Sequence, residues 1–199
     1  MASAETTTYK PSYLGLLNAI SLAESAAGVY LEAWANVTTN EDLACTLRLV
    51  AARERSHGEV FCRRIAELGY TLRTKSDPRG AEQLAKLANP HISDLEKIPP
   101  ERQEESDPFA EIRRRMAEGD FDAMTVNLMN WYIAEEKDSA KRLREAYACV
   151  RESAGGKRKG AARAMEGAPS ADAEAIMACM TAGFAKLEKA MEKLAKASK

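Results

Sequence analysis

The strongest constraint on the fold is a helical period in the apolar residues of the chain. In residues 12–37 the apolar row takes alternating steps of four and three residues and runs through Tyr13, Leu17, Ile20, Glu24, Ala27, Leu31 and Trp34. Residues at this spacing share one face of a helix, which buries that face against a neighbour. No segment shows the alternation of apolar and polar residues that is typical of a strand. The pattern predicts an all-α fold.

Two further stretches carry the same period. Residues 41–68 give the row Leu43, Leu47, Val50, Glu54, His57, Phe61, Ile65 and Leu68, and residues 120–150 give Leu128 or Met129, then Tyr132, Glu136, Ser139, Leu143, Ala146 and Val150. Because the turn "TTN" between the first two stretches is short, we expect them to form an antiparallel hairpin. Each row carries acidic or imidazole side chains near its middle.

The rest of the chain connects or follows these helices. Residues 70–119 are interrupted by prolines and glycines, and we interpret this long connection as a crossover along a helical bundle, with short helices around "GAEQLAKLA" and "PFAEIRRRMAEG". Residues 1–150 would then form the helical domain, and residues 151–170 a flexible linker. Residues 171–199 have the row Met177, Met180, Phe184, Leu187, Met191 and Leu194, which predicts a helix that is either the fourth helix of the bundle or a dimer seam.

The charge balance argues against several classes of partner. The 199 residues carry a net charge of −1, which gives no attraction to nucleic acid or to anionic membranes. The basic run "GKRKGAAR" has no aromatic residue that could stack on bases. No charge-free apolar run approaches the ~20 residues needed to cross a bilayer, and no secretion signal is visible. We expect a cytoplasmic protein with reduced cysteines, since its four cysteines form no CxxC pair.

The polar residues inside the apolar rows form the candidate site. Glu24, Glu54, His57 and Glu136 each lie near the middle of their predicted helix. At ~1.5 Å per residue, helices packed side by side would bring these side chains to one level. Glu54 and His57 are three residues apart, so they lie on one helical face and can reach one centre together. A drift of one residue in the last row would exchange Glu136 for Glu135.

Three carboxylates in an apolar core need compensation, because an unpaired buried charge costs several kcal/mol. Protons could supply it, and so could Arg53 or Arg55 from the neighbouring sequence. A divalent or trivalent cation is the third alternative, and carboxylate with imidazole is a ligand set that suits iron or manganese. The sequence therefore predicts a candidate metal site in the core, with protons and arginines as the alternatives.

This combination of motifs resembles the ferritin-like superfamily, the four-helix bundles that include ferritins, bacterioferritins, rubrerythrins and related di-iron oxygenases. The matching elements are Glu24, the stretch Glu54-Arg55-Ser56-His57, the long connection, and a glutamate in "YIAEEKDSA". The hairpin is most similar to bacterial ferritin-like proteins. Over residues 12–150, the resemblance implies a ferritin-like four-helix bundle with a long crossover between its second and third long helices.

The resemblance also implies roles for the side chains. Glu54 or Glu136 would bridge two metal ions, with Glu24 and His57 as terminal ligands; the metals would be one or two iron ions, or manganese, and a degenerate site would hold none. Rubrerythrin-like members carry a second Glu-x-x-His, for which this chain has Glu136-Lys137-Asp138-Ser139, with Ser139 in place of the histidine.

Two residues are expected just outside the ligands. Tyr132, one turn before Glu136, would hydrogen-bond a ligand carboxylate, although an aromatic residue of the core is the simpler interpretation. Ser139 would lie next to the metal where the family has its second histidine.

Two functions follow from this reading. The first is a metal-dependent oxidoreductase that acts with dioxygen or peroxide, of ferroxidase, peroxidase or oxygenase type. The second is a non-catalytic helical scaffold or oligomerisation protein with a degenerate metal site, in which protons or arginines neutralise the glutamates. In either case we expect a homo-oligomer, with a dimer favoured by the apolar row of residues 171–199.

Overall fold

The computed structural model describes residues 10–74, 77–100 and 107–161. Within these ranges the chain forms six helices and no strand, which confirms the prediction of an all-α fold. The helices are α1 (Leu14–Ala35), α2 (Glu41–Glu67), α3 (Pro78–Leu87), α4 (Asp94–Lys97), α5 (Ala110–Ala117) and α6 (Ala123–Ala161). The helix predicted over residues 171–199 and the second part of the predicted linker lie outside the described residues.

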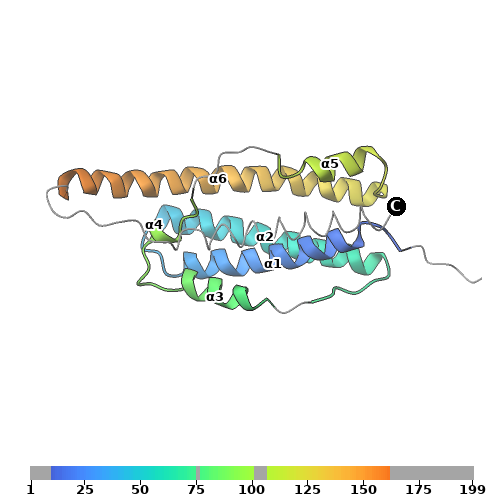
Figure 1. The fold of residues 1–199 in the computed structure, drawn as a ribbon, viewed down its shortest axis with the longest axis horizontal. Coiled ribbons are helices and arrows are strands. Elements are labelled where there is room, and N and C mark those ends of the chain that lie inside the picture. The colour runs from blue at the N-terminus through green and yellow to red at the C-terminus, as the bar shows by residue number, and fades with distance from the viewer. Residues whose placement is uncertain (1–9, 75–76, 101–106, 162–199) are drawn as a thin grey trace, which may run out of the picture.

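The three long helices lie side by side along the molecule (Figure 1). Helices α1 and α2 form the predicted antiparallel hairpin, and Asn40 caps the start of α2 by accepting a hydrogen bond from the backbone N–H of Leu43 at 3.0 Å. Helix α6 packs against α2. Helices α3 and α4 lie near the end of the molecule where α1 and α2 meet, and α5 lies near the start of α6 (Figure 1).

The sequence analysis expected the connection between α2 and α6 to cross the length of the bundle once. In the structure it runs along the bundle and comes back. Its middle docks at the far end of α1, where Asp94 accepts hydrogen bonds from Trp34 Nε1 at 2.7 Å and Thr38 Oγ1 at 2.6 Å. The chain then returns, and Phe109 packs against Tyr132, with ring centroids 6.0 Å apart, in the core that also contains Tyr13. A single crossing would leave α2 and α6 parallel; the return makes them antiparallel, and α6 begins beside the end of α2 (Figure 1).

Small residues hold α1 and α2 close together. Ser21 Oγ donates a hydrogen bond to the carbonyl oxygen of Gly58 at 2.8 Å. A Cβ on Gly58 would lie only 2.3 Å from Ser25 Oγ and 3.0 Å from the Ser25 backbone nitrogen, and one on Gly28 would lie 3.0 Å from the carbonyl oxygen of Ala51. Side chains at these positions would push the helices apart. The close approach brings residues on facing sides of α1 and α2 within reach of one ion.

Two apolar cores fill the bundle, one towards each end. The first comprises Tyr13, Leu16, Leu17, Ile20, Phe61, Ile65, Phe109, Ile112, Phe121, Met129, Tyr132 and Ile133. The second comprises Leu31, Trp34, Ala35, Leu43, Leu47, Val50, Ala51, Leu87, Ile98, Leu143, Tyr147 and Val150. On α1, α2 and α6 alike, the predicted polar residues fall in the gap between these two sets. The candidate site therefore lies at the seam between the cores.

A network around Asp122 ties the three long helices together at one end of the bundle. Asp122 accepts hydrogen bonds from Tyr13 Oη, from Arg64 Nη2 at 2.8 Å, and from the backbone N–H and hydroxyl of Thr125 at 3.0 and 2.7 Å. Arg64 Nε also donates to Thr125 Oγ1 at 3.1 Å. We call these four side chains the Asp122 network. It fixes the start of α6 against the start of α1 and the end of α2.

Helix α6 is longer than the sequence predicts. It continues to Ala161, through the first part of the segment 151–170 that was expected to be a flexible linker. A glycine inside a helix costs about 1 kcal/mol relative to alanine. Extending a helix that is already formed adds one hydrogen bond for each residue that is fixed, so the two glycines at 155 and 156 do not end it.

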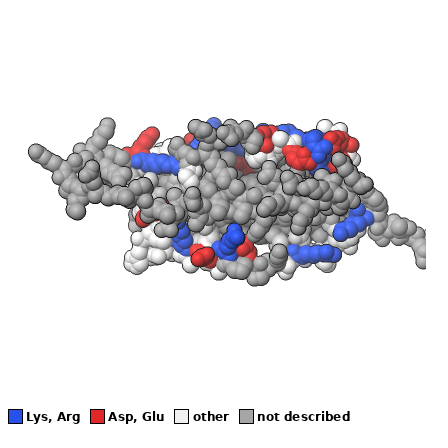
Figure 2. Space-filling model, in the orientation of Figure 1, with Lys and Arg blue, Asp and Glu red and all other residues white. Residues whose placement is uncertain are grey.

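The outer surface mixes both signs of charge. Figure 2 shows lysine and arginine next to aspartate and glutamate on the described part of this face, and in α5 Arg114 pairs with Glu111 and Glu118. Among the described helices, α1 alone has the length and mean hydropathy of a membrane span, with 44% of that window buried in the structure. Its buried residues include Leu17, Ile20 and Trp34 of the two cores.

Candidate metal centre

Four side chains from three helices converge at the seam between the cores. Glu24 comes from α1, Glu54 and His57 from α2, and Glu136 from α6, and each offers one ligand atom so that all four atoms lie within 4.8 Å of one another. Metal–nitrogen and metal–oxygen bonds of about 2.0–2.2 Å place opposite ligands at most about 4.4 Å apart. The four side chains, which we call the carboxylate–histidine cluster, therefore need only a small contraction to surround one ion.

Three polar atoms of the cluster are buried without a hydrogen-bond partner: Glu24 Oε2, His57 Nδ1 and Glu136 Oε1. His57 Nδ1 lies 3.2 Å from Glu136 Oε1 and 3.7 Å from Glu24 Oε2, which is close enough for attraction between a protonated imidazole and the carboxylates, but neither pair forms a hydrogen bond. Buried polar groups nearly always have a partner, since an unsatisfied one costs about 1–3 kcal/mol. Three such atoms lie on three helices and close to one another, so one cation could be the common partner of all of them. The residues present thus suit a metal ion.

The remaining polar atoms around the cluster hold it in place. Of the two interpretations that the sequence left open for Tyr132, the structure shows both: its ring packs in the first core, and its Oη donates a hydrogen bond to Glu24 Oε1 at 2.8 Å. This leaves Oε2 of Glu24 directed at His57. Ser139 is placed differently from the prediction: within the described residues it accepts a hydrogen bond from Arg53 at 3.4 Å and contacts none of the four cluster side chains by a hydrogen bond.

His57 is held on both sides. Its Nε2 atom lies 3.0 Å from Oε2 of Glu135, on the opposite side of the ring from the cluster. The edges of the ring meet Trp131 and Tyr132, with centroids 4.9 and 5.2 Å apart and interplanar angles of 85° and 86°. Of the two glutamates that the sequence left open, Glu136 therefore belongs to the set of four and Glu135 contacts the other nitrogen of His57.

Comparisons of the chain with protein-family models, with curated proteins and with solved structures give no match. Function is therefore inferred from the side chains of the cluster themselves.

Burial shapes the protonation of the metal-free cluster. Loss of water raises the pKa of Glu54 to about 11, and the charges of Glu24 and Glu136 add to this shift. Burial also raises the pKa of Glu136. Burial acts to raise the pKa of Glu24 as well, but contacts with His57 and Glu54 and the hydrogen bond from Tyr132 outweigh it and hold that pKa below its usual range.

Desolvation acts to lower the pKa of His57, but Glu136, Glu24 and Glu135 together raise it to about 10. In the metal-free protein, protons on Glu54 and His57 therefore compensate part of the negative charge. A cation that enters the cluster would take the place of these protons, so metal binding would release them.

The arginines named as alternative partners point elsewhere. Arg53 pairs with Asp138 on α6 at 2.6 Å, and Arg55 pairs with Glu32 on α1 at 3.3 Å. Neither forms an ion pair with a cluster glutamate within the described residues. Arg53 acts on Glu54 only as a nearby positive charge that partly offsets the rise in its pKa. Of the two kinds of compensation that the scaffold interpretation allows, the structure therefore does not show the one by arginine, and the one by protons stays open.

Sequence reasoning missed the contact between Glu135 and His57, although a signal for it was present. Consecutive helical residues point about 100° apart, since an α-helix has 3.6 residues per turn. The pair Glu135-Glu136 can therefore reach two sides of one imidazole ring. Only the distances across the α2–α6 interface show that both carboxylates use the same histidine.

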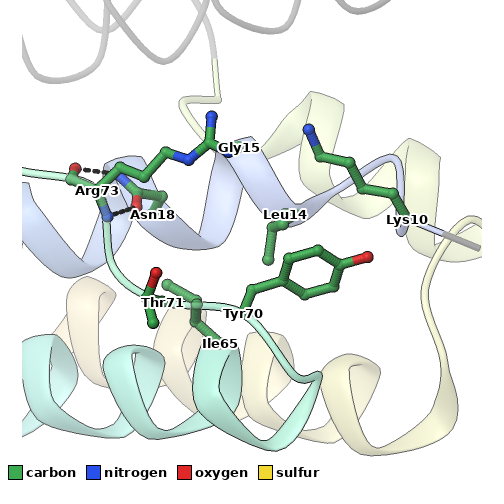
Figure 3. A pocket seen from close by; sticks show the side chains of 8 residues that line it. All are labelled: Lys10, Leu14, Gly15, Asn18, Ile65, Tyr70, Thr71 and Arg73. Atoms are coloured by element: carbon green, nitrogen blue, oxygen red, sulfur yellow. Dashed lines mark hydrogen bonds between the residues drawn. The ribbon is translucent and has the colours of Figure 1, made fainter. Parts of the chain in front are cut away.

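A separate cavity of about 210 Å³ lies between the start of α1 and the segment after α2, and Lys10, Leu14, Asn18, Tyr70 and Arg73 are among the residues that line it (Figure 3). Asn18 fixes this segment by donating a hydrogen bond to the carbonyl oxygen of Arg73 at 3.0 Å and accepting one from its N–H at 2.7 Å. The cavity contains no residue of the carboxylate–histidine cluster.

Proposed function

We propose that this protein binds iron, or manganese, in the carboxylate–histidine cluster and acts as an oxidoreductase on dioxygen or peroxide. One observation carries the proposal: three buried atoms from three helices face one point without hydrogen-bond partners. Their chemistry, carboxylate oxygen and imidazole nitrogen, suits iron and manganese better than softer ions. The ligand set resembles that of ferritin-like proteins, although Ser139 replaces the second histidine of rubrerythrin-like members and the connection between α2 and α6 goes and returns in place of a single crossover.

Each side chain around the cluster would have a distinct role in binding the ion. Glu24, Glu54, Glu136 and Nδ1 of His57 would hold the ion, and Tyr132 would orient Glu24 through its 2.8 Å hydrogen bond. The two apolar cores on either side of the seam would keep bulk water away. When bound, iron or manganese would supply the one-electron chemistry with dioxygen or peroxide that no protein side chain here provides.

We further propose that the long helices belong to a four-helix bundle. Helix α2 packs against both α1 and α6, and α1 and α6 run in the same direction. With a fourth helix this arrangement gives an up-down-up-down bundle. The apolar row from Met177 to Leu194 offers a suitable face for that helix.

Metal content tests the metal-binding proposal. Protein purified from iron-supplemented cells should contain iron or manganese in a fixed ratio to the chain, measured by elemental analysis, and that ratio also gives the number of ions. Glu54→Ala and His57→Ala should lose the metal. Glu59→Ala is the matched control, since Glu59 lies on the same helix and is exposed. A metal-free wild type that takes up neither ferrous nor manganous ion would favour the scaffold alternative.

The reaction is tested separately. Addition of ferrous iron to the metal-free protein in air should consume dioxygen faster than in buffer alone, followed with an oxygen electrode, and the increase should vanish in His57→Ala. A protein that binds the ion but speeds consumption of neither dioxygen nor peroxide would retain the metal site and lose the oxidoreductase assignment.

A further inference from the structure

We propose that Glu135 is the residue that positions His57 as a metal ligand: it accepts a hydrogen bond from Nε2 and thereby keeps Nδ1 directed into the cluster. The inference rests on the proposed metal function, because positioning matters only where an ion is bound. Glu135 does not itself belong to the four ligands. It acts through the imidazole ring.

The distances place the ring between two carboxylates. Nε2 lies 3.0 Å from Glu135 Oε2, whereas Nδ1 lies 3.2 Å from Glu136 Oε1. A carboxylate accepts hydrogen bonds only, so Nε2 must carry the proton in this contact. When a metal ion replaces the second proton of the ring, the contact with Glu135 keeps the remaining proton on Nε2 and leaves the lone pair of Nδ1 for the ion.

The polar contact with Glu135 also selects between two orientations of the ring. Turning the imidazole by 180° about its Cβ–Cγ bond would place a carbon where Nδ1 stands and remove the ligand atom. The contacts with Trp131 and Tyr132 are edge-to-face packing and restrict the plane of the ring, but packing alone does not distinguish nitrogen from carbon. The hydrogen bond to Glu135 does.

The burial of the two side chains makes this contact accessible to experiment. His57 is fully buried, with 0% of its side chain exposed, while 32% of the Glu135 side chain reaches solvent. Glu135 therefore lies at the rim of the site. Its replacement should disturb the orientation of His57 without opening a large cavity in the core.

Zinc affinity is the first test. Zn²⁺ binds the same nitrogen and oxygen ligands. It is also diamagnetic, so the same ion can be used for the affinity measurement and for the NMR spectra described below. Loss of a hydrogen-bond partner behind a histidine ligand typically costs 10–100-fold in metal affinity. We expect this loss in Glu135→Ala, measured by competition with a chromophoric chelator. Glu135→Gln retains an oxygen that can accept the Nε2 proton and should restore most of it, while Glu59→Ala should bind zinc like the wild type.

The imidazole signals are the second test. The chain contains two histidines, and His91 lies exposed in a turn, so ¹⁵N spectra of the labelled, zinc-loaded protein show only two rings. The His57 ring of the wild type should have a protonated Nε2 and a metal-bound Nδ1. In Glu135→Ala this pattern should be lost or mixed with the other tautomer, and in Glu135→Gln it should return.

The outcomes separate this inference from the function on which it rests. If the wild type takes up no zinc, iron or manganese, the metal proposal fails and the role of Glu135 falls with it. If the wild type binds zinc and Glu135→Ala binds it equally well with the same imidazole pattern, the inference alone is overturned. If Glu135→Ala does not fold, Glu135→Met can replace it, because this variant keeps the length of the side chain and removes the carboxylate acceptor. Weaker zinc binding with a changed imidazole pattern would support the inference, and unchanged binding with an unchanged pattern would overturn it.

Discussion

The Asp122 network and the carboxylate–histidine cluster are two polar groups that join the same three helices, yet they differ in how their charges are satisfied. In the Asp122 network each charged side chain has partners: Asp122 accepts from Tyr13, Arg64 and Thr125, and Arg64 also pairs with Glu67. In the cluster, three buried atoms have no hydrogen-bond partner.

This difference indicates what each group is for. A polar network that serves stability alone is complete within the protein, because an unpaired buried group costs free energy. The cluster is incomplete in a bundle whose other polar contacts are well made. We infer that its missing partner comes from outside the chain, and the following predictions test the contrast between the two regions.

The largest expected effect is the thermal shift on metal addition. At a free metal concentration of 100 times Kd, binding stabilises the folded state by about 2.7 kcal/mol, which corresponds to about 5–10 °C in Tm for a chain of this size. Glu54→Ala should abolish the shift. Asp122→Asn should lower the starting Tm and keep the shift, and a shift that disappears in both variants would contradict the division between the two regions.

The pH dependence of the metal-free protein should have opposite signs for the two regions. Raised pKa values of Glu54 (about 11) and His57 (about 10) mean that the folded state retains protons that the unfolded state has released. Stability from this source is complete at acid pH and falls as the pH rises, from about 4.5 for Glu54 and about 6.5 for His57. The pKa of Glu24 is lowered, so its contribution is complete above about 4.5 and does not oppose this decline.

The stability contributed by Asp122 has the opposite dependence on pH. Although burial acts to raise its pKa, hydrogen bonds from Tyr13, Thr125 and Arg64 hold that pKa well below its usual range. Its stabilisation is therefore present above about pH 4 and is lost as the pH falls further. Thermal melts between pH 3 and 10 should show both losses. Glu54→Gln should reduce the alkaline loss and Asp122→Asn the acid loss; a metal-free Tm that rises steadily from neutral to alkaline pH would contradict the protonation of the cluster.

Matched amide substitutions should change stability in opposite directions. Asp122→Asn keeps an oxygen that can accept the backbone N–H of Thr125, but it removes the negative charge that pairs with Arg64, and losing this partly exposed ion pair should cost about 1 kcal/mol. Glu54→Gln removes a carboxyl that must take up a proton to stay buried at neutral pH, so the metal-free protein should be unchanged or slightly more stable. Urea unfolding of both variants measures this, and equal destabilisation would remove the distinction.

The smallest effect is expected for Tyr132→Phe. The change removes one hydrogen bond to Glu24 and keeps the ring in the core. Metal affinity should fall by about tenfold, since partners of ligand residues typically contribute 10–100-fold. Ser139→Ala is the control, because Ser139 contacts Arg53 and not the cluster. Equal affinity in the two variants would show that Tyr132 only packs in the core.

Much of the site could be predicted from the sequence, because the positions of polar residues in an apolar helical row depend only on the helical period. Glu24, Glu54, His57 and Glu136 all fall on such rows, and the structure brings these four together. The partner of Ser139 could not be predicted in this way. Arg53 reaches it across the α2–α6 interface, and that contact depends on the register of two helices separated by more than fifty residues.

The direction of α6 also could not be predicted from the sequence. A long connection can have the same composition whether it crosses the bundle once or runs along it and comes back. The hydrogen bond between Trp34 and Asp94 and the contact of Phe109 with Tyr132 in the opposite core decide the course of the chain. These are contacts between residues far apart in the sequence, which no local pattern specifies.

The sequence by itself determined the three long helices, apart from the end of α6, and the inward face that carries the acidic residues, since both follow from a spacing of 3.6 residues per turn. Only the tertiary structure decided which atoms are left without partners, which glutamate faces the cluster and which side of the ring Glu135 holds. Those properties depend on how closely the helices pack at Ser21, Gly28 and Gly58 and on the relative register of α2 and α6.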